Sequence, residues 1–175
     1  FTGSWEAAAS LALRAGEPDA ANSYAEHGRL HTSHPALVAA QVAKAHARHE
    51  SQGQSIAITV NTAETARAVN REIQWQRHRR TGVGIDLHDD TTAYVGDRIA
   101  TRRNHPDLRS DTGERVRNRQ TWTVTDIAKD GTITARHDQR GTVTLPADYV
   151  AEHGELGWAV TGYGNQGDTV DVGIA

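Results

Sequence analysis

The residues best suited to chemistry lie in a glycine-rich run near the end of the chain, residues 162–167 (GYGNQG). The run matches G-x-G-x-x-G, a pattern in which glycines let the backbone approach the pyrophosphate of a dinucleotide at the start of a helix. Only eight residues follow Gly167, which is too few for the helix, second strand and ribose-binding acid of a dinucleotide fold. A dinucleotide-dependent enzyme is therefore disfavoured, and the run requires another interpretation.

The ten histidines suggest a second kind of chemistry, metal binding. His27 and His31 are four residues apart, and His46 and His49 are three apart, so each pair can share one face of a helix. The first pair straddles Gly28, where a helix is expected to end, and no carboxylate cluster accompanies either pair. Because the chain has no cysteine, thiolate ligands and disulfides are excluded as well. We therefore expect no metal site.

For a third kind of chemistry, ATP hydrolysis, the sequence lacks the central phosphate-binding motif. No segment has the form G-x-x-x-x-G-K-[ST], the loop that cradles the β and γ phosphates of ATP. The chain also contains no methionine, including at position 1, which favours a segment excised from a longer protein. Any ATP chemistry would therefore be completed by parts outside this segment.

The composition indicates a folded unit with a small core. Leu, Ile, Val and Phe make up only 30 of the 175 residues, but the net charge is only −3, so the combination that signals disorder is not met. The sequence has no signal peptide and no run of about 18 apolar residues. A cytoplasmic protein without membrane contact is expected.

Charge is distributed unevenly along the chain. Residues 98–119 contain seven arginines against three acidic residues, whereas residues 141–175 contain five acidic residues and no Lys or Arg. A basic patch of this size can bind phosphates, or it can be a solvated Arg-rich loop. Both interpretations stay open at this point.

The secondary structure predicted to position these residues differs between the two halves of the chain. Three helices are predicted in the first part, each ending at a glycine: residues 5–15, 18–27 and 35–53. The β-branched run 55–60 then predicts a buried strand, and Asn61 follows it as a helix cap with Glu64 three residues later. A strand, cap and helix in this order are typical of a parallel α/β sheet.

The second half has the pattern of short antiparallel strands. Four strands are predicted between turn residues: 94–103, 120–128, 132–137 and 141–145. One helical turn is predicted over 147–152, and two more buried strands over 157–162 and 169–174. This order indicates an α/β domain that starts, is interrupted by a small barrel or sandwich, and resumes.

Residues 159–171 (AVTGYGNQGDTVD) resemble the late motif of superfamily-one helicases related to the RecD type, which occur fused to conjugative relaxases. The family form is YA-x-T-x-H-[KR]-[AS]-Q-G-x-T-V-D. The resemblance implies that Thr161 and Tyr163 face single-stranded DNA and that Gln166 and Gly167 lie near the nucleotide. Thr169 takes the position at which many relatives carry a ribose-binding Glu.

Two positions depart from that motif. Tyr163 replaces the usual His, and Gly164 replaces the usual basic residue, which weakens the phosphate contact expected here. A tyrosine can still stack on a base, as aromatic side chains on single-strand paths do.

Other stretches resemble the same family in the same order. Residues 59–62 (TVNT), with 68–70 (AVN) and 73–74 (IQ), are similar to the strand and helix of the second RecA-like lobe. Asn61 and Thr62 are then candidates for a DNA phosphate contact. The structural alternative is a helix N-cap, which we favour for Asn61.

Residues 94–104 and 145–150 are similar to the start and the exit of an SH3-like barrel inserted in that lobe. On this resemblance Arg102, Arg103 and Asn104 are expected to contact DNA, and Arg109 adds phosphate attraction. Trp122 is either a stacking platform or, as we favour, part of the barrel core. Residues 4–14 and 24–30 resemble the segment that follows the central motifs of the motor.

The resemblance implies an α/β fold: a partial RecA-like domain of the second lobe, interrupted by a small antiparallel SH3-like β-barrel. The expected parts are 1–90 for the start of the lobe, 91–152 for the barrel and 153–175 for the return.

The function implied is a fragment of an ATP-dependent DNA helicase or translocase that is inactive alone. Its partners would be single-stranded DNA and the missing first lobe. ATP and Mg²⁺ would be cofactors of the intact parent only, with none for the fragment. The alternative is a stand-alone nucleic-acid-binding or scaffold module without ATPase activity.

Overall fold

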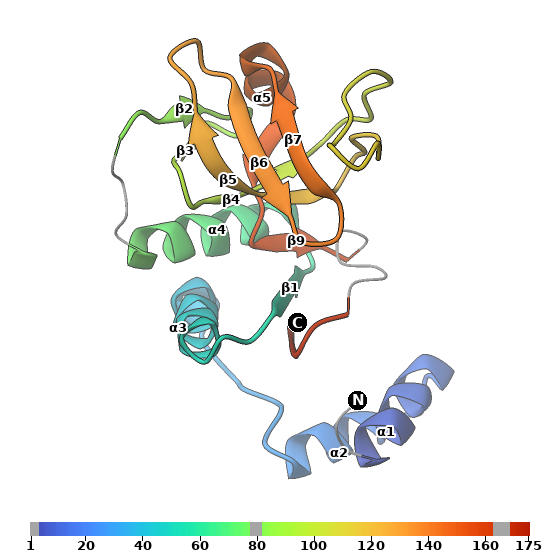
Figure 1. Cartoon of the computed structure of the whole chain (residues 1–175). Helices are drawn as coiled ribbons and strands as arrows, with labels where there is room; N and C mark the ends of the chain where they lie inside the picture. Colours follow the sequence, from blue (N-terminus) through green and yellow to red (C-terminus); the bar gives the residue numbers. More distant parts are fainter. Residues whose placement is uncertain (1–3, 78–81, 163–168) are drawn as a thin grey trace. The chain divides into compact units, whose positions relative to one another are not determined.

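A computed structural model describes residues 4–77, 82–162 and 169–175 of the chain. The chain divides into two compact units, Phe1–Leu37 and Val38–Ala175. The first unit contains helices, and the second is a mixed α/β structure with several sheets (Figure 1). None of the helices in the described ranges combines the length and the apolar character needed to cross a bilayer.

The first unit is a helical hairpin made of α1 (Ser4–Ala15) and α2 (Ala20–Glu26), followed by the 3₁₀ turn η1 (Pro35–Leu37). Gly16 has φ +75° and ends α1, as predicted; its N–H donates to the Leu13 carbonyl at 3.1 Å. The His27 ring stacks on Trp5, with ring centroids 3.8 Å apart. His27 therefore packs within this hairpin.

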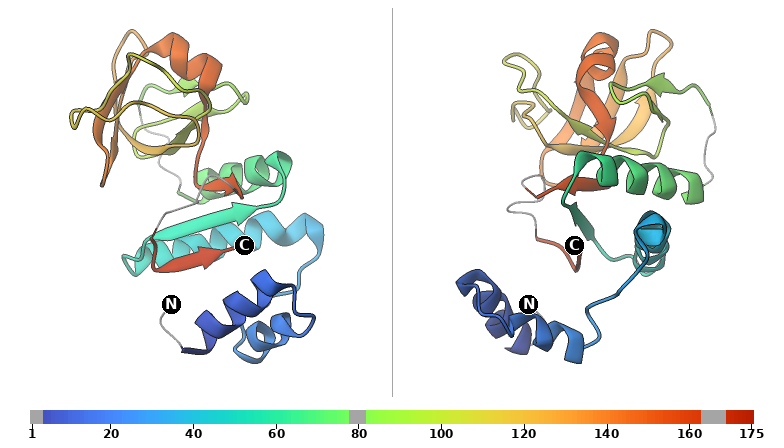
Figure 2. Two further views of the ribbon diagram at one scale, coloured as in Figure 1. Left: turned by 90° about the vertical axis from the view of Figure 1, so that its right-hand side faces the viewer. Right: turned by 180° about the vertical axis from the view of Figure 1, so that it is seen from behind.

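The second unit begins with the predicted parallel layer. Its elements are α3 (Val38–Ser51), β1 (Ile56–Val60), α4 (Ala63–Arg77), β9 (Ala159–Thr161) and β10 (Val172–Ile174). The strands pair in parallel in the order β10-β1-β9. In the left view of Figure 2, β10 (red) lies along β1 (teal). The predicted return of the chain to the first sheet is confirmed.

The remaining strands form a five-stranded antiparallel sheet in the order β7-β6-β5-β4-β8. They are β4 (Arg98–Thr101), β5 (Thr121–Ile127), β6 (Ile133–His137), β7 (Gly141–Leu145) and β8 (Gly154–Leu156). The helix α5 (Ala147–His153) follows β7, and a short pair, β2 (Ile85–Asp86) and β3 (Thr92–Ala93), precedes the sheet. The strands β4 to β7 were predicted; β2, β3 and β8 were not.

The expectation of a barrel requires a correction. Among the described residues the antiparallel sheet stays open, because its edge strands β7 and β8 are not paired with each other. The loop that precedes β5 bonds to β7 instead, through a bridge between Ser110 and Val143. At the other edge, the chain leaves β8 at Leu156 and soon enters β9 of the parallel sheet. The β7 edge thus has another partner, and the β8 edge is connected directly to the parallel sheet.

One hydrophobic core joins the two sheets. It contains Val69 and Ile73 of α4, Ile99 of β4, Leu156 of β8 and Trp122 of β5. Trp122 is 1% exposed, which confirms its interpretation as core rather than as a stacking platform. Residues on both sides of the predicted domain borders at 90 and 152 belong to this one core. The core therefore does not mark these borders, and they remain a prediction.

Candidate nucleic-acid interface

The candidate DNA-contacting residues Asn61, Thr62 and Thr161 lie at one edge of the parallel sheet. The strands β1 and β9 run in the same direction, and Val60 is paired with Thr161. The chain therefore leaves both strands at the same, carboxyl, edge. Asn61 and Thr62 are exposed and Thr161 is half-buried, so all three are accessible to a ligand.

Thr62, not Asn61, is the N-cap of α4. The Thr65 N–H donates to Thr62 Oγ1 at 3.1 Å, and the two hydroxyl oxygens are 2.8 Å apart. The cap that we favoured for Asn61 is therefore wrong by one residue, because the side chain that reaches the third residue of the helix belongs to position 62. Asn61 is exposed and makes no side-chain hydrogen bond within the described ranges.

Of the candidate nucleotide-contacting residues Gln166, Gly167 and Thr169, the structure describes only Thr169. Tyr163, Gln166 and Gly167 lie outside the described residues. Thr169 is exposed and precedes β10, which pairs with the amino end of β1 through Ile56 and Val172. Thr169 thus lies at the opposite edge of the sheet from Thr161.

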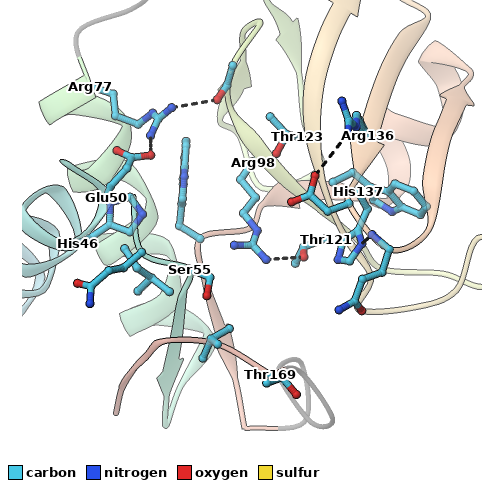
Figure 3. Close-up of a pocket in the computed structure, with 18 residues that line it drawn as sticks. His46, Glu50, Ser55, Arg77, Arg98, Thr121, Thr123, Arg136, His137 and Thr169 are labelled. Atoms are coloured by element: carbon cyan, nitrogen blue, oxygen red, sulfur yellow. Dashed lines mark hydrogen bonds and ion pairs between the residues drawn. The ribbon is translucent and has the colours of Figure 1, made fainter. Parts of the chain in front are cut away.

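Thr169 borders a cleft of about 400 Å³ between the helices α3 and α4 and the antiparallel sheet (Figure 3). Basic side chains predominate in its lining: Arg77, Arg98, Arg136, His46 and His137, against Glu50 and Asp138. Arg77 forms an ion pair with Glu50, and Arg98 Nη2 donates to Thr121 Oγ1 at 2.8 Å. The sequence had not indicated this cleft, because its lining comes from seven separate segments of the chain.

Lowering the pH from 7.5 to 5 is expected to destabilise the second unit through His46. Burial lowers the pKa of His46 below its usual 6.5; Glu50 opposes this effect, and Arg77 and Arg98 add to it. As the pH falls, the unfolded chain binds a proton near pH 6.5 that the folded state excludes. The neutral His46 therefore contributes its full stabilisation above pH 6.5. This contribution is lost as the pH falls from 6.5 to the lower pKa of His46 in the folded state.

Urea unfolding at pH 7.5 and 5 measures that loss, and the His46→Gln variant supplies the comparison. We expect a smaller loss in the variant, which cannot bind the proton. An equal loss in both proteins would show that His46 has no part in it.

Arg102, Arg103 and Asn104 follow β4 and already have partners in the structure. Arg102 forms an ion pair with Glu155 at 3.2 Å, and Arg103 Nη1 is 3.3 Å from His153 Nε2. Burial raises the pKa of Glu155, while Arg102 lowers it. Asn104 Oδ1 accepts a hydrogen bond from the Asn118 N–H at 2.7 Å.

These three residues lie away from Thr161. The strands β4 and β8 are antiparallel, and Thr101 is paired with Gly154, whereas Ile99 is paired with Leu156. The chain leaves β4 toward Arg102 at one end of this pair and leaves β8 toward β9 at the other end. The structure therefore does not bring Arg102 next to the carboxyl edge.

Asn70 of α4 is a buried residue whose role the sequence had not indicated. Its Nδ2 donates to the carbonyls of Leu156 at 2.7 Å and Ala159 at 3.0 Å. Its Oδ1 accepts a hydrogen bond from the Ala159 N–H at 2.6 Å. Asn70 thus fixes the segment that enters β9, the strand that ends at Thr161.

Gln74, one turn later on α4, fixes the other connection to the antiparallel sheet. Its Nε2 donates to the Thr92 carbonyl at 2.8 Å and to Asp97 Oδ2 at 2.5 Å. Asp97 Oδ2 also accepts the Tyr94 N–H at 3.0 Å. The sequence did contain a signal for these two roles. Asn70 and Gln74 are amides that directly follow Val69 and Ile73, which are buried.

Asp171, the last residue of the family-like motif, has a structural role. Its Oδ2 accepts hydrogen bonds from the Ser55 hydroxyl at 2.7 Å and the Ser55 N–H at 2.8 Å, and both lower the pKa of Asp171. The Asp171 N–H donates to Ser55 Oγ in return, at 2.9 Å. These bonds attach the start of β10 to the start of β1.

The described ranges contain no group of three or more His, Cys, Asp or Glu side chains arranged to hold a metal ion. No protein-family model matches the chain, and no curated protein matches it either.

Proposed function

We propose that this chain is part of an ATP-dependent DNA helicase or translocase of the superfamily-one type found in conjugative relaxases. Its role would be to bind single-stranded DNA within that motor. The observation that carries this function is the common edge of Asn61, Thr62 and Thr161. These residues are separated by about a hundred positions in sequence and come from two motifs that resemble the same family.

In this proposal the parallel layer is part of a RecA-like second lobe, and the antiparallel sheet is its SH3-like insertion. The strand order β10-β1-β9 supports the lobe, because the insertion lies between β1 and β9 in sequence while these strands are neighbours in space. The carboxyl edge of a parallel sheet is also where ligands bind in open α/β folds.

The chemistry of this edge suits a DNA backbone. The Asn61 amide and the Thr161 hydroxyl can donate hydrogen bonds to phosphate oxygens, which fix a strand in place without reading its sequence. The helix α4 begins here at the Thr62 cap, and the amino-terminal end of a helix favours an anion, although Glu64 in the first turn opposes it. Thr62 therefore acts mainly by positioning this helix end.

ATP and Mg²⁺ belong to the intact motor in this proposal. The loop that cradles the phosphates is not in the sequence, so these residues alone carry no step of hydrolysis. Gln166, Gly167 and Thr169 are proposed to contact the nucleotide once the first lobe closes. ATP binding and hydrolysis would supply the energy for the lobes to close and open, while the carboxyl edge holds the strand.

The Asn61→Ala/Thr161→Val double variant tests this function. We expect its affinity for a fluorescent oligo-dT strand to fall at least about tenfold, since hydrogen bonds to a charged group are lost. The dependence of affinity on salt should stay the same, because no positive charge is removed. Fluorescence anisotropy over a salt series measures both quantities.

The matched control is Asn22→Ala/Thr144→Val, which makes the same changes at exposed positions of α2 and β7. It should bind like the wild type. Equal affinities of the two double variants would remove the carboxyl edge from the DNA site.

A further inference from the structure

A hairpin formed by residues 108–117 presents three arginines on one face. The Val116 N–H donates to the Leu108 carbonyl and the Ser110 N–H to the Glu114 carbonyl, both at 2.9 Å, on either side of the Arg109–Arg115 bridge. This is the non-hydrogen-bonded type of antiparallel pair, which brings opposite side chains closest together. The two arginines therefore project from the same face.

Arg117 projects from that face too. It is two residues beyond Arg115 on the same limb, and Val116 between them is 1% exposed and turned into the core. Arg109, Arg115 and Arg117 are all exposed. We call the surface formed by these three residues the arginine face.

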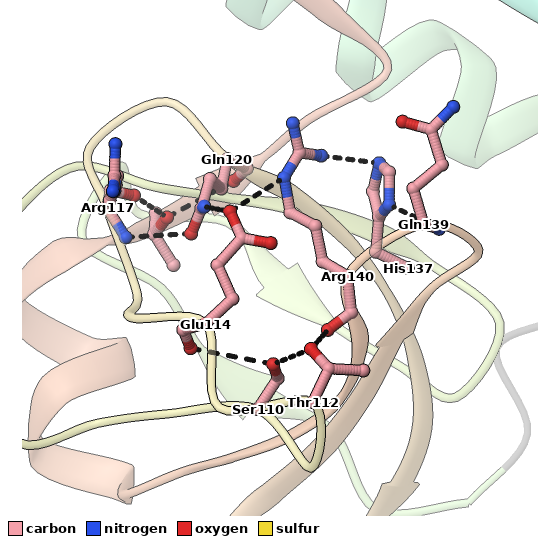
Figure 4. A network of polar contacts seen from close by, with 9 residues as sticks. Ser110, Thr112, Glu114, Arg117, Gln120, His137, Gln139 and Arg140 are labelled. Atoms are coloured by element: carbon pink, nitrogen blue, oxygen red, sulfur yellow. Dashed lines mark hydrogen bonds and ion pairs between the residues drawn. The ribbon is translucent and has the colours of Figure 1, made fainter.

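The acidic residues of the hairpin, Asp111 and Glu114, have their own partners elsewhere in the protein. Asp111 Oδ1 accepts the Thr142 N–H at 2.8 Å. Glu114 turns toward the body of the sheet, where its Oε1 accepts Gln120 Nε2 at 3.1 Å and lies 3.6 Å from Arg140 Nε (Figure 4).

The arginines of the face have few partners of their own. Arg109 donates to the Gly113 carbonyl at 3.1 Å. Within the described ranges, the guanidinium groups of Arg115 and Arg117 form no ion pair. Like charges placed opposite each other destabilise a pair of strands. The arginine face thus carries positive charge that no ion pair among the described residues neutralises.

The hairpin is hydrogen-bonded to the sheet at several points. Ser110 bridges to Val143 of β7, and the Asp111 N–H donates to the Thr142 carbonyl at 2.8 Å. Thr112 Oγ1 donates to the Arg140 carbonyl at 2.9 Å. A ligand that binds the arginine face would therefore not have to order the backbone beneath it.

We propose that the arginine face binds the phosphate backbone of duplex DNA. Guanidinium groups recognise phosphates through paired hydrogen bonds, and three of them in one surface suit a polyanion. Residues 106–119 contain no aromatic side chain, whereas surfaces for single strands use aromatic rings to stack on bases. A duplex keeps its bases stacked inside and offers only phosphates to such a surface.

This inference rests on the proposed function in taking DNA as the partner, but it concerns another part of the molecule and another form of DNA. It also changes which arginines of residues 98–119 are expected to bind phosphate. Arg102 already has a carboxylate partner, whereas Arg115 and Arg117 have none in the described ranges.

The Arg115→Gln/Arg117→Gln double variant tests the inference by fluorescence anisotropy with a labelled 20-base-pair duplex. The salt dependence should weaken by about 1.8 in the log–log slope, or 0.9 for each lost phosphate contact. Affinity at 50 mM salt should then fall on the order of 100-fold, with the difference closing toward 1 M. The control Arg14→Gln/Arg29→Gln removes the same charge from exposed positions of the first unit and should change affinity less than threefold.

The same proteins are then measured with a single strand. The Arg115/Arg117 variant should keep its affinity for oligo-dT within about threefold, while the Asn61/Thr161 variant should keep its affinity for the duplex. Circular dichroism should give the Arg115/Arg117 variant a melting temperature no lower than that of the wild type, since like charges are removed.

Three results would overturn the inference: no duplex binding by the wild type, no loss in the Arg115/Arg117 variant, or an equal loss for single strand and duplex. If instead the wild type binds the duplex as predicted but does not bind oligo-dT, the proposed function is contradicted and the inference about the arginine face is not.

Discussion

Replacing Asn70 by alanine is expected to destabilise the second unit by roughly 3–5 kcal/mol. The side chain is 3% exposed and bonds to the Leu156 carbonyl and to both backbone groups of Ala159. Its loss would leave two carbonyls and one N–H buried without partners, and each such group costs about 1–3 kcal/mol. Urea unfolding followed by circular dichroism measures the change in free energy.

Asn118→Ala is the control for this prediction, because Asn118 is exposed and the structure gives its side chain no hydrogen bond in the described ranges. It should change the free energy of unfolding by less than about 0.5 kcal/mol. A value for Asn70→Ala within 1 kcal/mol of the wild type would mean that the segment entering β9 is held by other contacts.

Replacing Gly157 by alanine is expected to destabilise the same unit by about 2–3 kcal/mol. A Cβ at this position would lie 2.7 Å from the Ile99 carbonyl carbon and 2.8 Å from the Ala100 nitrogen. Both atoms belong to the backbone of β4, which is paired on both sides by β5 and β8, so neither can move without shifting a strand. The Gly157 N–H also donates to the Arg98 carbonyl at 2.8 Å, which holds the two chains close together.

Gly173→Ala is a matched control within β10, because a Cβ there would meet no atom within 4 Å. The melting temperatures of both variants are measured by thermal unfolding. Their difference gives the effect of the steric clash with β4 at Gly157, apart from the general effect of adding a methyl group to a glycine. The prediction fails if the two variants melt at the same temperature.

Elements with strong local signals were predictable from the sequence. The β-branched run that became β1 and the Asp-Gly turn before β6 depend on neighbouring residues, and Gly131 has φ +81° as such a turn requires. The short strands β2 and β8 carry no such signal. Each has two or three residues and is defined by its pairing with another strand: β2 pairs with the nearby β3, whereas Leu156 of β8 pairs with the distant Ile99 of β4.

Parts of the site were predictable to within one residue. A polar residue after β1 indicated a helix cap, but Asn61 and Thr62 are both good caps, and only the geometry assigns that role to Thr62. The open edge of the antiparallel sheet was not predictable, since closure depends on whether two strands far apart in sequence meet. The sequence did show the arginine excess of residues 98–119, yet the partners of its acidic residues are known only from the fold.

The roles of Asn70 and Gln74 illustrate a signal that sequence reasoning can use. Both amides lie on the face of α4 that buries Val69 and Ile73, where an unpaired polar group would be costly. Their presence on an apolar face therefore indicates specific partners, even though the identity of those partners requires the fold. In this unit the partners lie on the two connections between the sheets.

The central claim is that single-stranded DNA binds at the carboxyl edge of the parallel sheet. The most direct test is ¹⁵N amide chemical-shift mapping of the chain during titration with oligo-dT at low salt. We predict saturable shifts for Asn61, Thr62 and Thr161, and none for Ser55 at the opposite edge. Saturable binding with unchanged amide shifts at Asn61, Thr62 and Thr161 would contradict the claim.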